Sequence, residues 1–202
     1  LLLGVPHDFF SAEANVNGFE LPALGDYAVG MVFLPPEPEL YRTCKETLER
    51  VAAAEGATVL GWRNVPINDD SLGEFALATM PRFEQVFLHR GEWDRNVFER
   101  KLFVIRHGAE RRVRAAAADS SQFYIASLSN CRIVYKGMLT GTGLARFFPD
   151  LNDPRFASAF AIVHQRYSTN TLPTWNLAQP LRILAHNGEI NTLRGNINRI
   201  RA

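Results

Sequence analysis

The sequence predicts an α+β fold with a largely antiparallel sheet. Strand-like and helix-like segments occur in groups along the chain and do not alternate strictly, which disfavours a parallel α/β sheet. Strand-like runs such as Tyr27–Leu34 end at breakers such as Pro35-Pro36. Two longer stretches repeat apolar residues at helical spacing. The 202 residues suffice for one sizeable domain or for part of a larger one.

In the N-terminal part, apolar runs bounded by breakers predict three strands: Leu1–Val5, Tyr27–Leu34 and Thr58–Trp62. Between the second and third strands, apolar side chains recur at steps of four, four and three, on one face of a helix: Leu40, Cys44, Leu48 and Val51. Gly56 suits the C-terminal cap of this helix. The stretch Val65–Met80 contains Pro66 and several turn residues, and we predict a loop with one helical turn there.

The middle of the chain predicts a strand, a long helix and a hairpin. Phe83–Leu88 is the strand, and Asp94 is a suitable N-cap for the helix that follows. One face of this helix is apolar: Phe98, Leu102, Ile105, Ala109 and Val113. The other carries an arginine run that we predict to be solvated: Arg106, Arg111, Arg112 and Arg114. Ser129-Asn130, between the strand-like runs Phe123–Leu128 and Arg132–Tyr135, indicates a hairpin.

Two further strands are predicted near the C-terminus, Phe156–His164 and Ile183–His186. A short helix at Leu144–Phe148, stopped by Pro149, precedes them. Because the chain starts in an apolar strand and stops at Ala202 in a helix-like segment, we expect it to be cut at both ends.

Composition and charge exclude several classes of function. The net charge of +1 gives no indication of a nucleic-acid partner. No signal peptide or apolar run of about 18 residues indicates a membrane. Cys44 and Cys131 are far apart and belong to no metal-binding motif, so we predict two buried thiols and no metal. We expect His164 and His186, which end predicted strands, to make structural hydrogen bonds.

Candidate site residues concentrate directly after the last two predicted strands, in the segments 164–171 and 185–192. The fork of Arg166 can hold a carboxylate through two hydrogen bonds. The side-chain amide of Asn187 and the N–H of Gly188 can converge on an oxyanion. Taken alone, these residues favour simpler alternatives, which are a structural ion pair for Arg166 and a hairpin turn for Asn187-Gly188.

An ordered set of motifs along the chain favours a ligand-binding role for these residues over the simpler alternatives. The chain contains His-Gln-Arg-Tyr-Ser-Thr-Asn-Thr at 164–171 and Leu-Ala-His-Asn-Gly-Glu-Ile-Asn-Thr-Leu-Arg-Gly-Asn at 184–196. Further matching segments are 25–31, 134–139, 148–151, 173–175 and 177–180. Together these segments resemble the glutaminase domain of glutamate synthase large subunits, which are class II glutamine amidotransferases of the N-terminal-nucleophile hydrolase family. The resemblance spans nearly the whole chain.

The resemblance implies a fold, a site and a reaction. The fold is a four-layer αββα sandwich of the N-terminal-nucleophile hydrolase type, here incomplete at both ends. Arg166 matches the position that binds the α-carboxylate of glutamine, and Tyr167, Thr169 and Asn170 match positions that line the pocket. Asn187 and Gly188 match the oxyanion hole. In this family the thiolate of an N-terminal cysteine attacks the glutamine amide, its own α-amine accepts the proton, ammonia leaves through an internal tunnel, and water releases glutamate.

The sequence departs from the family pattern at the nucleophile. Residue 1 is leucine, and neither Cys44 nor Cys131 is terminal. We therefore expect residues 1–202 to be a partial amidotransferase domain whose catalytic cysteine lies upstream of Leu1, and to be inactive alone. We expect the acidic residue that binds the substrate ammonium to lie beyond Ala202.

The resemblance also implies cofactors and partners outside this stretch. Later domains of the family enzyme carry FMN and an iron–sulfur cluster and use the ammonia to convert 2-oxoglutarate to glutamate. We expect no cofactor within residues 1–202. The implied partners are glutamine, the remaining domains of the large subunit, and a small NADPH-oxidising subunit or ferredoxin, in the cytoplasm or in a plastid. Two alternatives stay open: another class II amidotransferase, such as the purine or amino-sugar enzymes, and a non-catalytic glutamine sensor.

Overall fold

The computed structural model describes residues 1–117, 121–165, 172–181 and 193–201. Its strands form two sheets in which every pairing is antiparallel. The four-stranded sheet has the order β3-β4-β2-β5, with β2 at Tyr27–Leu34, β3 at Thr58–Asn64, β4 at Arg82–His89 and β5 at Tyr124–Ser129. The three-stranded sheet has the order β6-β1-β7, with β1 at Leu2–Gly4, β6 at Arg132–Val134 and β7 at Ala161–Ile162.

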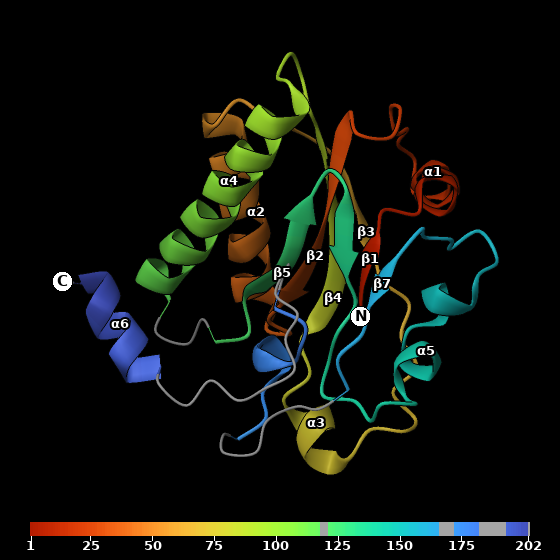
Figure 1. The fold of residues 1–202 in the computed structure, drawn as a ribbon, viewed down its shortest axis with the longest axis vertical. Coiled ribbons are helices and arrows are strands. Elements are labelled where there is room, and N and C mark those ends of the chain that lie inside the picture. Colours follow the sequence, from red (N-terminus) through yellow and green to blue (C-terminus); the bar gives the residue numbers. More distant parts are fainter. Residues whose placement is uncertain (118–120, 166–171, 182–192, 202) are drawn as a thin grey trace.

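Helices lie on both sides of the four-stranded sheet. Figure 1 shows α2 (Pro38–Ala54) and α4 (Arg95–Ala116) side by side on one face. On the opposite side lie the three-stranded sheet, α1 (His7–Val16) and α5 (Leu144–Phe147). The remaining short elements are α3 (Glu74–Ala78), two 3₁₀ turns, η1 (Pro149–Asn152) and η2 (Trp175–Leu177), and α6 (Leu193–Arg201). The two antiparallel sheets with flanking helices confirm the predicted α+β sandwich class.

Two apolar cores meet at β2, which explains why this strand is one continuous apolar run. All of its residues are buried, because it lies between β4 and β5 and is covered on both faces. Its side chains alternate between the cores. The core against α2 and α4 contains Ala28, Val32 and Leu34. The core toward the three-stranded sheet, α1 and α5 contains Tyr27, Val29, Met31 and Phe33.

The two long predicted helices are confirmed, with Gly56 and Asp94 at the ends predicted for them, and the structure adds a cap at the start of α2. Glu37 caps α2 by accepting hydrogen bonds from the N–H groups of Glu39 and Leu40. After α2 the chain turns at Gly56, whose φ of +86° favours glycine. Asp94 caps α4 as predicted. Among the described residues, no helix is both long and apolar enough to span a bilayer.

The predicted hairpin is wrong, because β5 and β6 pair with different sheets. β5 pairs with β2, and β6 pairs with β1, so the chain crosses between the sheets after Ser129. Side chains supply hydrogen bonds where a hairpin would have ladder bonds. The Val134 N–H donates to Ser127 Oγ at 3.1 Å, and the Asn130 N–H donates to the Glu99 carboxylate at 2.6 Å.

Several other predictions need correction. Arg106 is buried, because α4 turns it toward Glu110, with Nη1 3.4 Å from Oε2; Arg111, Arg112 and Arg114 are exposed, as predicted. Cys131 is exposed at the crossing between the sheets, whereas Cys44 is buried as predicted. The strand predicted at Phe156–His164 shortens to β7, and α1 has no counterpart among the predictions. The strand predicted at Ile183–His186 lies outside the described residues.

Candidate functional site

The six predicted site residues lie outside the described residues: Arg166, Tyr167, Thr169, Asn170, Asn187 and Gly188. Their predicted roles therefore stay predictions. The structure does describe the residues next to them in the chain, which are Gln165 on one side of the run 166–171 and the segment 172–181 on the other. These neighbours and the elements that hold them form the described part of the candidate site.

A small cavity lies where the chain reaches Gln165. Its volume is about 50 Å³, and it lies between the loop that follows β6 and the residues that follow β7. Its polar lining comes from Lys136, Thr140, His164, Gln165 and Gln179. His164 and Gln165, the polar residues predicted at the end of a strand, thus line this cavity together with the loop that follows β6.

Two glycines in the loop after β6 allow close contacts with the candidate region. A Cβ on Gly141 would lie 3.0 Å from Cδ of Gln165, so the glutamine side chain packs directly on the loop backbone. A Cβ on Gly137 would lie 2.6 Å from Cζ3 of Trp175, a distance that real Cβ contacts essentially never show. The Trp175 indole N–H donates to the Ala76 carbonyl at 3.1 Å, which fixes the ring in the core.

Lys136 connects this loop to both of its neighbours. Its side chain is among the largest that are fully buried, with 1% exposed. Nζ donates to the Asn176 carbonyl at 2.8 Å and to the Tyr124 hydroxyl at 3.3 Å. It also lies 4.5 Å from the centroid of the Tyr124 ring, a cation–π geometry. Lys136 therefore joins the three-stranded sheet, through β6, to β5 and to η2.

A buried polar network holds the end of β6, where the loop begins. The Tyr135 hydroxyl donates to Asp150 Oδ2 at 2.7 Å and accepts from Gln85 Nε2 at 2.7 Å. Asp150 in turn pairs with both terminal nitrogens of Arg63 at 2.8 Å. Burial, reinforced by the Asp150 carboxylate, raises the pKa of Tyr135 well above its usual value, so the hydroxyl stays a donor.

Sequence reasoning gave the loop after β6 no role in the site. Its residues are part of the matching segment 134–139, but no local pattern marks Lys136 as buried or as linked to Asn176. Gly141-Thr142-Gly143 at the end of this loop forms a turn, with the Gly143 N–H donating to the Thr140 carbonyl at 2.9 Å. The signal that was missed is long-range, since Lys136 and Asn176 are 40 residues apart.

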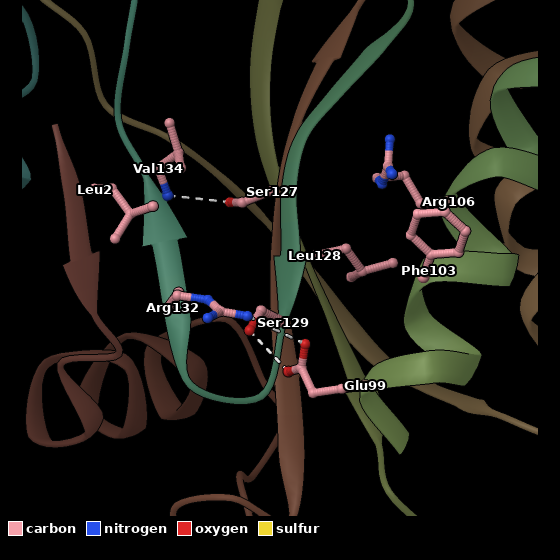
Figure 2. Close-up of a pocket in the computed structure, with 9 residues that line it drawn as sticks. All are labelled: Leu2, Glu99, Phe103, Arg106, Ser127, Leu128, Ser129, Arg132 and Val134. Atoms are coloured by element: carbon pink, nitrogen blue, oxygen red, sulfur yellow. Dashed lines mark hydrogen bonds and ion pairs between the residues drawn. The ribbon is translucent and has the colours of Figure 1, made fainter. Parts of the chain in front are cut away.

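A larger cavity of about 260 Å³ lies between α4 and the crossing from β5 to β6. Figure 2 shows its lining, with Glu99 directed at Ser129 and Arg132. Apolar side chains make up much of this lining, including Leu2, Leu128 and Val134.

No group of three or more His, Cys, Asp or Glu side chains arranged to hold a metal ion occurs within the described parts of the chain.

The whole chain, residues 1–202, matches the family model described as glutamine amidotransferases class-II. The chain belongs to this family. It is 47% identical to the glutamate synthase [NADPH] large chain of Azospirillum brasilense and 46% identical to that of Bacillus subtilis (strain 168), over 99% and 100% of this chain and 13% of each relative. It is 44% identical to the ferredoxin-dependent chloroplastic glutamate synthase of Oryza sativa subsp. japonica, over 100% of this chain and 12% of that protein. The chain thus spans only a small part of these relatives.

The structure of this class-II glutamine amidotransferase chain therefore describes the scaffold around its predicted substrate-binding run. Residues on both sides of 166–171 contact the loop after β6, and that loop is fixed by Lys136 and by the network at Tyr135. The relatives named above differ in the electron donor that their names give, NADPH or ferredoxin.

Proposed function

We propose that this chain is part of the glutaminase domain of a glutamate synthase large subunit. In this function it hydrolyses glutamine to glutamate and supplies ammonia for the reductive amination of 2-oxoglutarate. The observation that carries the proposal is the identity of 44–47% to glutamate synthases from bacteria and a plant over 99–100% of the chain. These relatives favour a glutamate synthase over the alternatives of a purine or amino-sugar amidotransferase and of a glutamine sensor.

The proposed site assigns one task to each predicted residue. Arg166 holds the α-carboxylate of glutamine, because its fork matches a carboxylate. Tyr167, Thr169 and Asn170 line the pocket around the substrate. The Asn187 amide and the Gly188 N–H stabilise the oxyanion that forms when the nucleophile attacks the side-chain amide.

The proposed nucleophile is an N-terminal cysteine outside residues 1–202. Its sulfur bonds to the amide carbon and its α-amine takes up the thiol proton. That proton is passed to the departing nitrogen as the carbon–nitrogen bond breaks and ammonia leaves, and water then hydrolyses the γ-glutamyl thioester. Neither cysteine of this chain suits the task. Burial raises the pKa of Cys44 to about 12, and Cys131 lies at the crossing between the sheets.

The proposed cofactors and partners lie elsewhere in the enzyme. FMN and an iron–sulfur cluster supply the electron transfer of 2-oxoglutarate reduction when they are bound in other domains. The two cysteines of this chain are too few for a four-cysteine cluster site. We propose the remaining domains and either a small NADPH-oxidising subunit or ferredoxin as partners, in the cytoplasm or in a plastid. Val163, Leu172 and Leu177, which lie before and after the run 166–171 in the chain, are exposed and offer apolar surface to such domains.

Variants of the full-length protein test the site. Arg166→Lys keeps the charge but loses the bidentate contact, so we expect mainly a higher KM for glutamine. Asn187→Ala removes an oxyanion donor, so we expect kcat for glutamine hydrolysis to fall by roughly 10²–10³. Ammonia-dependent glutamate synthesis, where the enzyme shows it, is the control that both variants retain. An Asn187→Ala enzyme with unchanged glutaminase turnover would remove this residue from the oxyanion hole.

The mature N-terminus of the full-length protein separates the enzyme from the sensor alternative. We expect a cysteine as residue one, because the mechanism needs a thiolate and an α-amine on the same residue. Mass spectrometry of the N-terminal peptide provides the measurement. Any other residue at that position, together with glutamine binding but no glutamate release, supports the sensor.

A further inference from the structure

One loop, residues 136–141, contacts the chain on both sides of the run 166–171. On the N-terminal side, Gln165 packs on Gly141, with only 3.0 Å between its Cδ and an ideal Cβ at that glycine. On the C-terminal side, Trp175 packs on Gly137 and the Asn176 carbonyl accepts from Lys136. Described residues on the two sides of the run are therefore held to one short stretch of backbone.

Lys136 makes the strongest of these contacts. Its ammonium is buried, and a hydrogen bond from a charged donor is worth more than a neutral one, especially away from water. Lys136 Nζ donates to the Asn176 carbonyl at 2.8 Å. The hydroxyl and ring of Tyr124, which it also contacts, lie on β5 of the other sheet. Removing the ammonium would leave the Asn176 carbonyl and the Tyr124 hydroxyl each without this donor.

The support beneath Lys136 is rigid. Tyr135 directly precedes it and is fixed by hydrogen bonds to Asp150 and Gln85, while its backbone N–H donates to the Leu1 carbonyl at 2.9 Å. A change at Asn176 is therefore not easily absorbed by movement of the loop. The position of η2 relative to β6 depends on the lysine side chain.

We propose that Lys136 is a positioning residue for glutamine. By holding Asn176 to the loop after β6, its ammonium sets the distance between Gln165 and Trp175 and thereby the geometry available to substrate. This inference rests on the proposed function, in which residues between those two positions contact glutamine. Lys136 itself need not touch the substrate.

The test is Lys136→Met in the full-length enzyme, which keeps the length and apolar stem of the side chain but removes the charge and the donor. We expect KM for glutamine to rise about tenfold or more, the effect of losing one charge-assisted hydrogen bond, with a smaller change in kcat. Lys136→Gln, which keeps an N–H donor without charge, restores part of the loss. Tyr124→Phe removes one hydroxyl partner and shifts KM in the same direction by less.

Lys45→Met is a matched control on another part of the molecule. Lys45 Nζ also donates to a tyrosine hydroxyl, that of Tyr41, at 3.2 Å, and lies 4.4 Å from the Trp62 ring centroid. Its ion pair with Glu84 adds a structural role, so the control lowers the melting temperature but leaves KM for glutamine unchanged.

The outcomes are distinct. A KM within twofold of wild type for Lys136→Met overturns the proposal, as does a rise in KM matched by the Lys45→Met control. If Lys136→Met does not fold, Tyr124→Phe and Lys136→Gln decide, and an unchanged KM in both overturns the proposal. Failure of the proposed function is recognised separately, because the wild-type enzyme then releases no glutamate from glutamine.

Discussion

At the scale of single residues, the two cysteines show how position decides chemistry. Cys44 lies on the buried face of α2 in the core against α4, with no exposed surface. Burial disfavours the thiolate and raises the pKa to about 12. Cys131, in contrast, is exposed, and its sulfur lies 3.5 Å from Ser129 Oγ. The same residue type is thus inert at one position and accessible at the other.

Alkylation with iodoacetamide at pH 8 tests this difference. We expect Cys131 to be modified and Cys44 to stay free, as read by peptide mass spectrometry, because Cys44 is buried and its raised pKa leaves little thiolate at that pH. In guanidinium chloride both should react. Equal labelling of both thiols in the native protein would contradict the assignment.

Because the folded pKa of Cys44 lies above the unfolded value, the contribution of its burial to stability is present below about pH 9 and is lost as pH rises toward 12.

At the scale of elements, α4 holds the crossing between the two sheets. Glu99 Oε1 accepts from the Ser129 hydroxyl at 2.8 Å, and Oε2 lies 3.6 Å from Arg132 Nη2 (Figure 2). Oε1 also accepts from the Asn130 N–H at 2.6 Å. These bonds satisfy polar groups that a hairpin would have paired across its ladder. The crossing therefore depends on a side chain from an element that precedes both strands.

Glu99→Ala tests the crossing. It leaves the buried Asn130 N–H without its acceptor, which costs roughly 1–3 kcal/mol locally. We expect hydrogen exchange at the Asn130 amide, measured by mass spectrometry of the full-length protein, to accelerate about tenfold or more. Glu99→Gln keeps an acceptor oxygen and serves as the control, with a much smaller change. If both variants exchange at the wild-type rate, the carboxylate does not hold the crossing.

At the scale of the whole molecule, one buried ion pair joins elements from distant parts of the chain. Arg63 on β3 pairs with Asp150 on η1, with 3% of each side chain exposed. Gln85 on β4 and Tyr135 after β6 complete the network, and Glu13 on α1 lies 2.9 Å from Arg63 Nη2. The network thus links β3 and β4 of the four-stranded sheet to the end of β6 in the three-stranded sheet.

Asp150→Ala tests this network. It leaves the Arg63 guanidinium buried with only its other partners, and breaking such a pair costs roughly 3–5 kcal/mol. We expect this part of the protein to unfold at a markedly lower temperature. Hydrogen exchange of β3 and β4, recorded at increasing temperature, is the measurement. Asp153→Ala, which breaks an exposed pair with Arg155, is the control and should leave that exchange unchanged. Similar effects from both variants would show that burial adds nothing to the Arg63–Asp150 pair.

Local sequence patterns were sufficient to predict several elements of the fold. The bounds of β2 were predicted as found, because an apolar run ended by two prolines has few alternatives. The predicted cap of α4 is also local, since Asp94 accepts from amides two and three residues away. The motif order was enough to predict the amidotransferase family, which the match over residues 1–202 confirmed.

The pairing of strands, the burial of polar groups and the support of the candidate site depend on tertiary packing, which local patterns do not reveal. The Lys136–Asn176 contact joins residues 40 positions apart, and the Arg63–Asp150 contact joins residues 87 positions apart. Local periodicity cannot predict contacts over such separations, and the same holds for strand pairing. The hairpin prediction failed for this reason: two strands adjacent in sequence found better partners in different sheets. Burial of Arg106 likewise depends on α4 lying against β5. Local patterns determine whether a segment forms a helix or a strand, whereas tertiary packing determines which other elements it contacts. The predicted site is supported by such tertiary contacts.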